Sequence, residues 1–332
     1  MKLALAFLLL LSGLTFATDK SLGAERDAAV RLQILLDNRL FGPGFIDGKP
    51  GTFTKRALVS YNRSQGRDEA DTAAAQAEAD EEITHTYVTV TVPRASSKFV
   101  NTSLPHKREA QAKVRALHYR SYFEFMAERY HTSESVLYEL NGKNTTWALR
   151  PGHTVVVPNV EPFKIEDLKP GRSHKGDAPY LAQRRIVISP EEKQVQIFEP
   201  APNLVASNGG ISSSEEHYRL VASFPTTPGQ ERYIHRGTWT LKNCIEWPTW
   251  RYDKQMLKQG KRGKNALLIP GGPNNPVGVV WAGLSKSGIG IHGTDNPRTI
   301  GRARSSGCYR LANWDVARLF TVVRPGATVI VE

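Results

Sequence analysis

The sequence predicts a multidomain protein with a small all-α N-terminal domain, an α+β module in the middle and a mostly β C-terminal domain. Apolar residues follow helical spacing over residues 27–63, and two short helical segments and a strand are predicted over residues 116–158. From Tyr180 onward the apolar spacing has a period of two, in short runs bounded by Gly, Pro and Asn. A chain of 332 residues, 40% of them hydrophobic, is long enough for about two or three cores.

The first 17 residues are typical of a secretory signal peptide. Lys2 precedes an apolar run from Leu3 to Leu11, and small residues mark a cleavage point after Ala17. A membrane anchor is the alternative, but this run is well short of the roughly 20 residues that span a bilayer. We therefore expect an exported protein, periplasmic or cell-wall associated, without a stable membrane span.

Residues 25–66 are predicted to form two helices that enclose a Gly-rich loop. An apolar stripe over residues 30–36 is interrupted at residues 42–44, and helical spacing resumes over residues 53–61. The segment resembles the small helical peptidoglycan-binding domain at Val30, Leu32, Gln33, Leu36, Gly44, Ile46, Asp47, Gly48, Gly51, Thr54, Ala57 and Leu58. An arbitrary helical hairpin is the alternative, although helical spacing alone does not require the Ile-Asp-Gly turn.

Residues 67–84 are predicted to be an acidic linker. The stretch 67–82 has seven acidic residues, one Arg, many alanines and no large apolar residue. Such a composition cannot bury much apolar surface, so we expect a solvated segment, with a frayed helix as the alternative to an irregular chain.

Residues 85–160 are predicted to form a second module. Helical spacing at 123–130 and 136–140 precedes a strand at 154–157. The A-E-R-Y, L-N and PG-x-x-V-x-VP segments resemble the rear portion of a LysM glycan-binding module, and residues 86–92 can supply its first strand. The opening Gly-Asp pair is missing and the intervening segment is long, so the resemblance is to a degenerate LysM. It implies either glycan binding or a spacer.

The charge is strongly basic and unevenly placed. The formal net charge is +12, and residues 251–310 hold 11 Lys plus Arg against Asp253 and Asp295. For an exported protein this favours cell-wall polymer, lipid head groups or extracellular nucleic acid as a partner. No nucleic-acid recognition motif accompanies the charge, so we expect no nucleic acid partner.

The C-terminal domain, residues 180–332, is predicted to be built from short strands. These are expected at residues 186–188, 195–198, 218–222, 238–241, 278–281, 289–291 and 328–331. Residues 201–216 are predicted to be an inserted surface loop.

Residues 290–311, GIHGTDNPRTIGRARSSGCYRL, carry the most informative motif. It matches H-G-T, six residues, G, three residues, S-x-G-C-x-R, the pattern of the L,D-transpeptidase catalytic domain family (YkuD-like). Residues 271–278 and 248–250 resemble the family's G-P-x-N-P-L-G and P-T-W segments. The family's usual T-P-x-G is replaced by His-Arg-Gly-Thr-Trp at 235–239. The resemblance implies a cysteine enzyme acting on peptide stems of peptidoglycan.

The residue types at the motif suit thiol catalysis. A thiol of pKa near 8.5 is only slightly ionised at neutral pH, so Cys308 needs a base, for which His292 is the candidate. A strand end and a returning loop can bring these residues together, whereas a helix would hold them roughly 24 Å apart. The backbone amides of Gly307 and Cys308 are expected to form the oxyanion hole, with Ser306 as a further donor. Nearby arginines, Arg310 among them, also favour thiolate.

Further roles are implied only by the resemblance. The carbonyl of Gly293 would orient the imidazole, and Arg310 would hold a substrate carboxylate or brace the loop. Ser305 would fix the turn, and Thr294 is assigned to the substrate site. Many relatives have His where this chain has Ser306, which leaves the role of that side chain open. No metal or cofactor is required.

The remaining cysteine and histidines are given ordinary structural roles. Cys244 is predicted to be a buried thiol, and a Cys244–Cys308 disulfide is the alternative. The histidines at positions 106, 118, 131, 153, 174, 217 and 235 lack the spacing of metal ligands, so we expect no metal site.

We therefore predict an L,D-transpeptidase that forms peptidoglycan cross-links through a thioester on Cys308 and takes tetrapeptide stems as substrate. With water as acceptor, the same site would be an L,D-carboxypeptidase. A catalytically silent wall-binding protein is the alternative from another class. A papain-like peptidase is disfavoured because its Cys precedes its His in sequence, whereas here His292 comes first. The acyl acceptor and the oligomeric state stay open.

Overall fold

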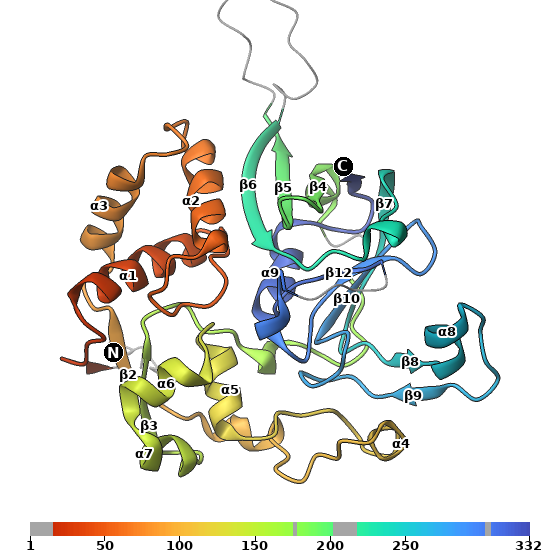
Figure 1. Ribbon diagram of the computed structural model, residues 1–332, viewed down its shortest axis with the longest axis horizontal. Helices are drawn as coiled ribbons and strands as arrows, with labels where there is room; N and C mark the ends of the chain where they lie inside the picture. Colours follow the sequence, from red (N-terminus) through yellow and green to blue (C-terminus); the bar gives the residue numbers. More distant parts are fainter. Residues whose placement is uncertain (1–15, 175–177, 202–217, 303–306) are drawn as a thin grey trace, which may run out of the picture.

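The computed structural model describes residues 16–174, 178–201, 218–302 and 307–332. Most of the predicted signal peptide and of the predicted 201–216 loop lies outside these ranges, as do Ser305 and Ser306. Figure 1 shows three parts: helices at the N-terminus, a small sheet with short helices, and a large C-terminal sheet. We call them the helical part, the middle part and the sheet part.

The helical part consists of α1 (Ala24–Asn38), α2 (Thr52–Ser64) and α3 (Thr72–Glu82). Its Gly-rich loop is fixed by Gln33 of α1, whose side-chain carbonyl accepts hydrogen bonds from the amides of Asp47, at 2.9 Å, and Gly48, at 2.8 Å. Gly48 has φ +69°, which favours glycine. The predicted Ile-Asp-Gly turn is thus a loop held by one buried glutamine.

Helix α3 lies within the segment predicted to be a solvated linker. Asp71 caps it by accepting a hydrogen bond from Ala74. Ala75 and Ala79 are fully buried against the other two helices, and Glu78 pairs with Arg67 at 2.7 Å. The linker prediction allowed only a frayed, solvated helix, because the buried face of α3 is made of alanines, which give little hydrophobic periodicity.

The middle part has a small antiparallel sheet and short helices. Strands β2 and β3 pair along their whole lengths, and β1 lies at the outer edge of β2. The elements are β1 (Phe16–Ala17), β2 (Tyr87–Thr91), α4 (Arg108–Gln111), α5 (Tyr122–Arg129), α6 (Glu134–Asn141), α7 (Lys143–Trp147) and β3 (Thr154–Pro158). Serines at the N-caps of α5 and α6 accept backbone hydrogen bonds.

The long segment between β2 and α5 extends onto the sheet part. Leu104 and Leu117 are buried against Ile269. The guanidinium of Arg108 lies 5.3 Å from the ring centre of Trp250. The segment that makes the LysM resemblance incomplete therefore packs against the C-terminal domain.

The sheet part has an eight-stranded sheet in the order β12-β11-β10-β7-β13-β4-β5-β6. Its strands are β4 (Arg185–Ser189), β5 (Gln194–Pro200), β6 (Tyr218–Pro225), β7 (Gly237–Glu246), β10 (Val280–Leu284), β11 (Gly290–His292), β12 (Tyr309–Arg310) and β13 (Thr328–Val331). The pairs β11–β12 and β13–β4 are parallel, and the other pairs are antiparallel. The mostly β prediction for this domain is confirmed.

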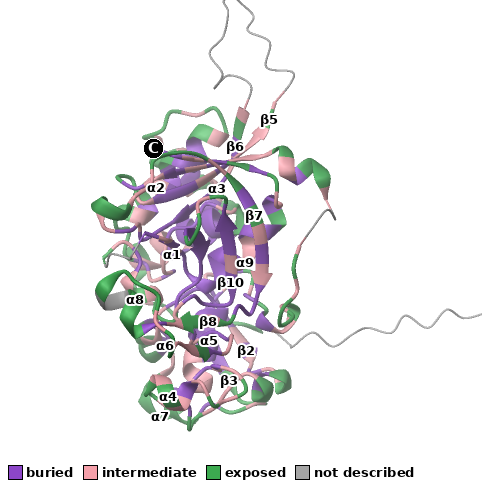
Figure 2. Cartoon of the chain, turned by 90° about the vertical axis from the view of Figure 1, so that its right-hand side faces the viewer, coloured by how far each residue is buried: buried purple, intermediate pink, exposed green. Residues whose placement is uncertain are grey.

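Two features of the sheet part were not predicted. Strands β8 (Trp250–Tyr252) and β9 (Leu267–Ile269) form a separate pair joined through α8 (Lys254–Gln259). Helix α9 (Asn313–Val322) packs against β10, β11 and α5. Buried residues gather around β10 and α9, whereas α4 and α7 at the end of the molecule are largely exposed (Figure 2).

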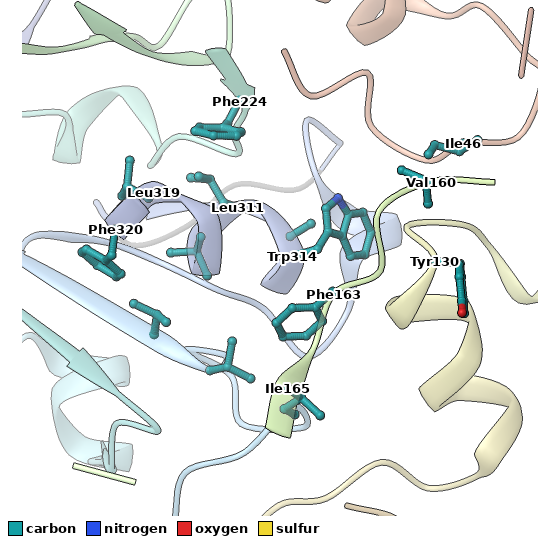
Figure 3. Close-up of a cluster of buried hydrophobic side chains, with 14 of the residues drawn as sticks. Ile46, Tyr130, Val160, Phe163, Ile165, Phe224, Leu311, Trp314, Leu319 and Phe320 are labelled. Atoms are coloured by element: carbon teal, nitrogen blue, oxygen red, sulfur yellow. The ribbon is translucent and has the colours of Figure 1, made fainter. Parts of the chain in front are cut away.

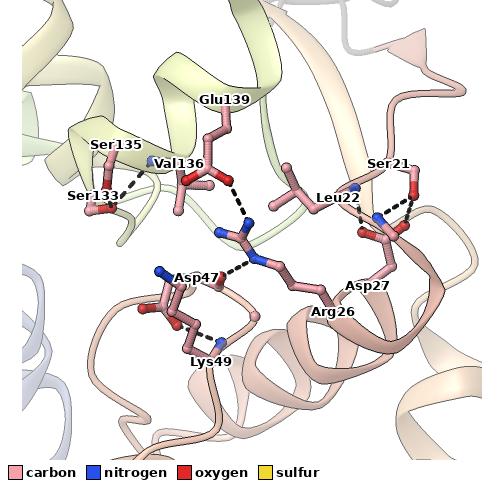
Figure 4. Close-up of polar contacts among 12 residues, drawn as sticks. Ser21, Leu22, Arg26, Asp27, Asp47, Lys49, Ser133, Ser135, Val136 and Glu139 are labelled. Carbon is pink, nitrogen blue, oxygen red and sulfur yellow. Dashed lines mark hydrogen bonds and ion pairs between the residues drawn. The ribbon is translucent and has the colours of Figure 1, made fainter.

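One hydrophobic core runs through all three parts. It contains Ile46 of the Gly-rich loop, Tyr130 of the middle part, Phe163 from the segment after β3, and Phe224 and Trp314 of the sheet part (Figure 3). On the surface, Arg26 of α1 donates to the carbonyl of Asp47, at 2.9 Å, and forms an ion pair with Glu139 of α6 (Figure 4). The parts are therefore packed against one another rather than strung along a flexible chain.

A buried charge network joins the same three parts. Asp37 of α1 accepts a hydrogen bond from His131 at 2.8 Å and pairs with Arg318 of α9 at 2.8 Å. Arg318 also contacts Asp315 at 2.7 Å. Burial by itself raises the pKa of Asp37, but Arg318 and His131 outweigh it and hold the pKa well below its usual range.

We expect Asp37→Ala to lower the free energy of unfolding by about 3–5 kcal/mol, because it leaves Arg318 buried and incompletely paired. Asp80→Ala is the matched control. Asp80 of α3 pairs with Arg31 of α1, the helix that also carries Asp37, but the side chain of Asp80 is 46% exposed. Its expected loss is about 0–1 kcal/mol. Denaturant unfolding of both variants measures the difference. Equal losses would mean that the network contributes no more than a surface ion pair.

Candidate active site

His292 lies at the end of β11, between two neighbouring strands. It is opposite Trp281 of β10 and Arg310 of β12 in the strand register. Its imidazole is 5% exposed and stacks on the ring of Trp281, with centroids 5.6 Å apart. The stacking fixes the plane of the imidazole before any substrate binds.

One hydrogen bond determines the tautomer of His292. Nδ1 lies 2.7 Å from the carbonyl oxygen of Gly293. A carbonyl oxygen can only accept, so Nδ1 carries the hydrogen of the neutral ring. Nε2 is then left with its lone pair, which is what a general base requires.

The protein keeps this imidazole neutral. Burial lowers the pKa of His292, the hydrogen bond to the carbonyl of Gly293 partly offsets this, and the positive charge of Arg310 adds to it. The resulting pKa is about 4. At neutral pH the ring is therefore uncharged, with a hydrogen on Nδ1 and none on Nε2.

Cys308 immediately precedes β12 and is half-buried. Its Sγ lies 3.5 Å from the carbonyl oxygen of Gly288. Burial raises the pKa of this thiol, while the backbone of Gly290 and the charge of Arg310 lower it. The resting site thus has a neutral thiol just before β12 and a neutral imidazole at the end of β11, on two neighbouring parallel strands. This charge state suits proton transfer at the moment of attack.

Two glycines define the turn before Cys308. Gly307 has φ +117°, a conformation that other residues rarely adopt. A Cβ at Gly229 would lie 2.6 Å from Cα of Gly307, so the two backbones touch. The close approach places the loop of Gly229 directly against the predicted oxyanion turn.

Thr227 braces this loop, although no motif in the sequence analysis pointed to it. Its amide donates to the carbonyl of Arg310 at 2.9 Å, and its carbonyl accepts from the amide of Arg310 at 3.0 Å. Its hydroxyl accepts from the amide of Gly301 at 2.7 Å and donates to the carbonyl of Thr299 at 3.2 Å. One fully buried threonine therefore ties β12 to the loop that follows His292.

A second brace holds Gly293. A Cβ at Gly293 would lie 2.3 Å from Oδ1 of Asn313, and that oxygen accepts a hydrogen bond from Val279 at 3.1 Å. Nδ2 of Asn313 donates to Glu128 of α5 at 3.0 Å. Burial raises the pKa of Glu128 to about 8, so this carboxyl is protonated at neutral pH. The middle part thus contacts the residues that support the imidazole.

The other predicted site residues are placed as follows. Thr294 is 2% exposed, and its hydroxyl accepts from the amide of Asn296 at 3.2 Å, so it shapes the loop from within. Arg310 is half-buried beside His292 and Cys308. Ser305 and Ser306 lie outside the described residues.

Strand geometry argues against the Cys244–Cys308 disulfide. Cys244 is fully buried on β7, in register with Ala282 of β10. The order β12-β11-β10-β7 separates the two cysteines by three strand spacings, about 14 Å. Disulfide-bonded cysteines have Cα atoms less than about 7 Å apart. The prediction that Cys244 is buried is confirmed.

In the part of the chain that the structure describes, no helix has both the length and the apolar character needed to cross a membrane.

Comparison with known proteins finds matches to one family. The family model described as the L,D-transpeptidase catalytic domain matches residues 183–331. The putative L,D-transpeptidase YkuD of Bacillus subtilis is 48% identical over 60 residues, which cover 18% of this chain and 37% of that protein. The probable L,D-transpeptidase YcfS of Escherichia coli is 26% identical over 208 residues, which cover 62% of this chain and 57% of that protein.

Among solved structures, L,D-transpeptidase 3 from Mycobacterium tuberculosis is similar over 55% of this chain and 75% of that chain, with 14% identity and a TM-score of 0.31. The chain spans less than half of the Bacillus relative and somewhat more than half of the Escherichia relative. Residues 183–331 thus match the L,D-transpeptidase catalytic domain of the YkuD family, and relatives named as putative or probable L,D-transpeptidases match parts of the chain.

Proposed function

We propose that the protein is a cysteine-dependent L,D-transpeptidase that cross-links peptidoglycan through a thioester on Cys308. The observation that carries the proposal is the buried, neutral imidazole of His292, whose Nδ1 is engaged by Gly293. It lies on the strand next to the half-buried Cys308, in a domain matched by the family model.

In the proposed first step, Nε2 of His292 takes the thiol proton as Sγ of Cys308 attacks the carbonyl before the terminal D-Ala of a tetrapeptide stem. The amides of Gly307 and Cys308, with Ser306 as a further donor, stabilise the oxyanion. The imidazolium then passes its proton to the departing amine, so that D-Ala leaves and a thioester remains.

In the second step an amine of a neighbouring stem attacks the thioester. His292 takes a proton from that amine and returns it to the sulfur, which restores the thiol and leaves a new amide bond. Arg310 is proposed to hold a substrate carboxylate or brace the loop, and Ser305 to fix the turn. The assignment of Thr294 to the substrate site stays a proposal; its burial favours an action through the loop rather than direct contact. No metal or cofactor enters either step.

The N-terminal parts are proposed to hold the enzyme on the wall. The helical part would act as a peptidoglycan-binding domain and the middle part as a degenerate LysM, either gripping glycan or spacing the catalytic domain. Export to the periplasm or cell wall, after cleavage of the signal peptide, is part of the same proposal. The structure of the first 15 residues is not described.

Mass spectrometry of purified tetrapeptide stems after incubation with the full chain tests the proposal. Dimers joined through third residues, with release of D-Ala, are the expected products. Trimmed monomers without dimers would favour the L,D-carboxypeptidase alternative, in which water resolves the thioester. Unchanged stems would favour a non-catalytic wall-binding protein.

The lowered pKa of His292 predicts an unusual pH profile. The base is active only when unprotonated, so acylation of Cys308 should rise with pH around pH 4 and be flat above about pH 6. An unperturbed histidine would place the midpoint near pH 6.5. The acylation rate with a carbapenem, measured by intact mass between pH 3.5 and 8, gives the profile. Circular dichroism at each pH checks that the protein remains folded. A midpoint near 6.5 in folded protein would contradict the buried base.

A further inference from the structure

Two adjoining cavities lie where the three parts of the molecule meet. One, of about 270 Å³, is lined mainly by the start of α5 and α6 and by residues 295–298. The other, of about 530 Å³, is lined mainly by the Gly-rich loop of the helical part and by residues 297–302. The lining residues that the two cavities share are Phe45, Ser133, Pro297, Arg298 and Trp314. We call the two together the junction groove.

The junction groove is separate from the reacting atoms. Neither Cys308 nor His292 lines either cavity. Its wall includes residues 295–302, the loop that leaves His292 and is tied to β12 through Thr227. A ligand in the groove would therefore touch the same loop that supports the catalytic strands, but from outside the reaction centre.

The two ends of the groove carry opposite charge. The smaller cavity is lined by the carboxylates of Glu124, Glu134 and Asp295 and by the protonated Glu128, against two arginines. The larger is lined by five cations, Lys49, Arg56, Lys193, Arg298 and Arg302, against two aspartates. The ion pair between Arg298 and Glu134, at 3.0 Å, marks the boundary between the two ends.

Burial makes the carboxyls of the acidic end harder to ionise than usual. Burial raises the pKa of Glu124, of Glu128 and of Asp295. Three neighbouring carboxyls shifted in the same direction would all be stabilised in their charged form by an ammonium group. In the basic end, Lys49 and Arg302 are exposed and can meet a carboxylate from solvent.

The floor between the two ends is aromatic and contains polar atoms without partners. The rings of Phe45 and Trp314 have centroids 5.7 Å apart. Among the described residues, Nε1 of Trp314 and Oδ2 of Asp315 have no hydrogen-bond partner, although both side chains are at least 98% buried. Both atoms are themselves inaccessible to solvent, so the groove offers a ligand the side chains of Phe45 and Trp314 rather than these polar atoms.

We infer that the junction groove binds a zwitterionic peptide, with its ammonium group toward Glu134 and Asp295 and its carboxylate toward Lys49 and Arg302. Resting on the proposed function, the ligand is a peptidoglycan stem that carries a free side-chain amine and a free carboxylate. This stem is bound in addition to the one attacked by Cys308. In the groove the stem would contact residues 295–302 of the sheet part together with residues of the middle and helical parts. All three parts would therefore contribute to binding this stem.

Binding is tested on the full chain with Cys308→Ala, so that the stem is not consumed. The probes are a soluble tetrapeptide stem, the same stem with its side-chain amine acetylated, and the same stem with its terminal carboxyl amidated. Calorimetry should show weaker binding of both modified stems. Lys49→Glu should weaken binding of the unmodified stem by about fivefold to tenfold, the size expected of one charge contact, and should abolish the preference over the amidated stem. Glu134→Gln should abolish the preference over the acetylated stem.

Two matched control variants make the same charge changes at residues that do not line the groove. Lys55→Glu alters an exposed lysine of the helical part, and Glu161→Gln alters a side chain that is 77% exposed. Both should bind all three probes as the parent does. If these controls lost as much affinity for the stem as Lys49→Glu and Glu134→Gln, the inference would be overturned. It would also be overturned if the Cys308→Ala protein without further changes bound the acetylated and amidated stems as tightly as the unmodified stem.

The outcome is separable from that of the proposed function. If unaltered protein cross-links or trims stems while the groove variants bind like the parent, the groove assignment fails and the enzyme assignment stands. If stems remain unchanged by the unaltered protein but bind with the charge dependence described, the enzyme assignment fails and the groove assignment stands.

Discussion

Replacing Cys308 by alanine should abolish D-Ala release from tetrapeptide stems. The proposed nucleophile is then lost, and water cannot form the thioester on which both cross-linking and trimming depend. The side chain of Cys308 is only half-buried, so the smaller residue should leave the fold intact. Product analysis by mass spectrometry measures the loss, and a carbapenem, which the family resemblance suggests as a covalent inhibitor, should add no mass to the variant.

Cys244→Ala is the matched control. Cys244 is fully buried on β7, about three strand spacings from Cys308, so its replacement should reduce stability modestly and leave turnover largely unchanged. An inactive Cys244 variant together with an active Cys308 variant would mean that the nucleophile has been assigned to the wrong thiol.

Replacing His292 by alanine should slow acylation of Cys308 by about 10²- to 10⁴-fold, the usual contribution of a positioned general base. The thiol, whose pKa is raised by burial, then loses the imidazole that is proposed to take its proton. The rate of carbapenem addition, followed by intact mass, isolates this step from the later attack by the acceptor. Ser306→His should be tolerated, since relatives carry that residue.

His118→Ala provides the comparison for the imidazole. His118 also packs on a tryptophan, with its ring 6.0 Å from that of Trp247, but it lies in the middle part. Its replacement should leave the acylation rate close to that of the unaltered protein. Acylation at the native rate in His292→Ala, with loss of the adduct in another histidine variant, would make His292 a structural residue.

The catalytic domain was largely predictable because its strands alternate and its motif is local. The runs around Ile186, Val195 and Val329 lie on β4, β5 and β13 as predicted. The predicted strand at 278–281 begins two residues later, at Val280, because Gly278 has φ +62° and cannot continue a strand. Helix α9 was missed, since most of its residues are buried and its apolar spacing is not confined to one face.

The supports of the site could not be predicted, because they join distant residues that have no motif. Thr227 contacts the loop at Gly301 across 74 positions, and Asn313 meets Glu128 across 185. Asp37 looked like an ordinary helical aspartate until the fold brought His131 and Arg318 to it. The stacking of Trp281 on His292 was the easiest to anticipate, because Trp281 lies on the predicted strand 278–281 and His292 directly follows the predicted strand 289–291.

The buried network of Asp37, His131 and Arg318 has a mechanical consequence if the protein acts on cell-wall polymer as proposed. A wall-binding module on a flexible tether searches a volume set by the length of its linker. Here the helical and middle parts are fixed to the catalytic domain by a shared core. If they grip a glycan strand as proposed, the thiol of Cys308 sits at one set displacement from that strand. The distance between the bound glycan and Cys308 would then be fixed, and the spacing of stems along and between glycan strands would determine which stems are acylated.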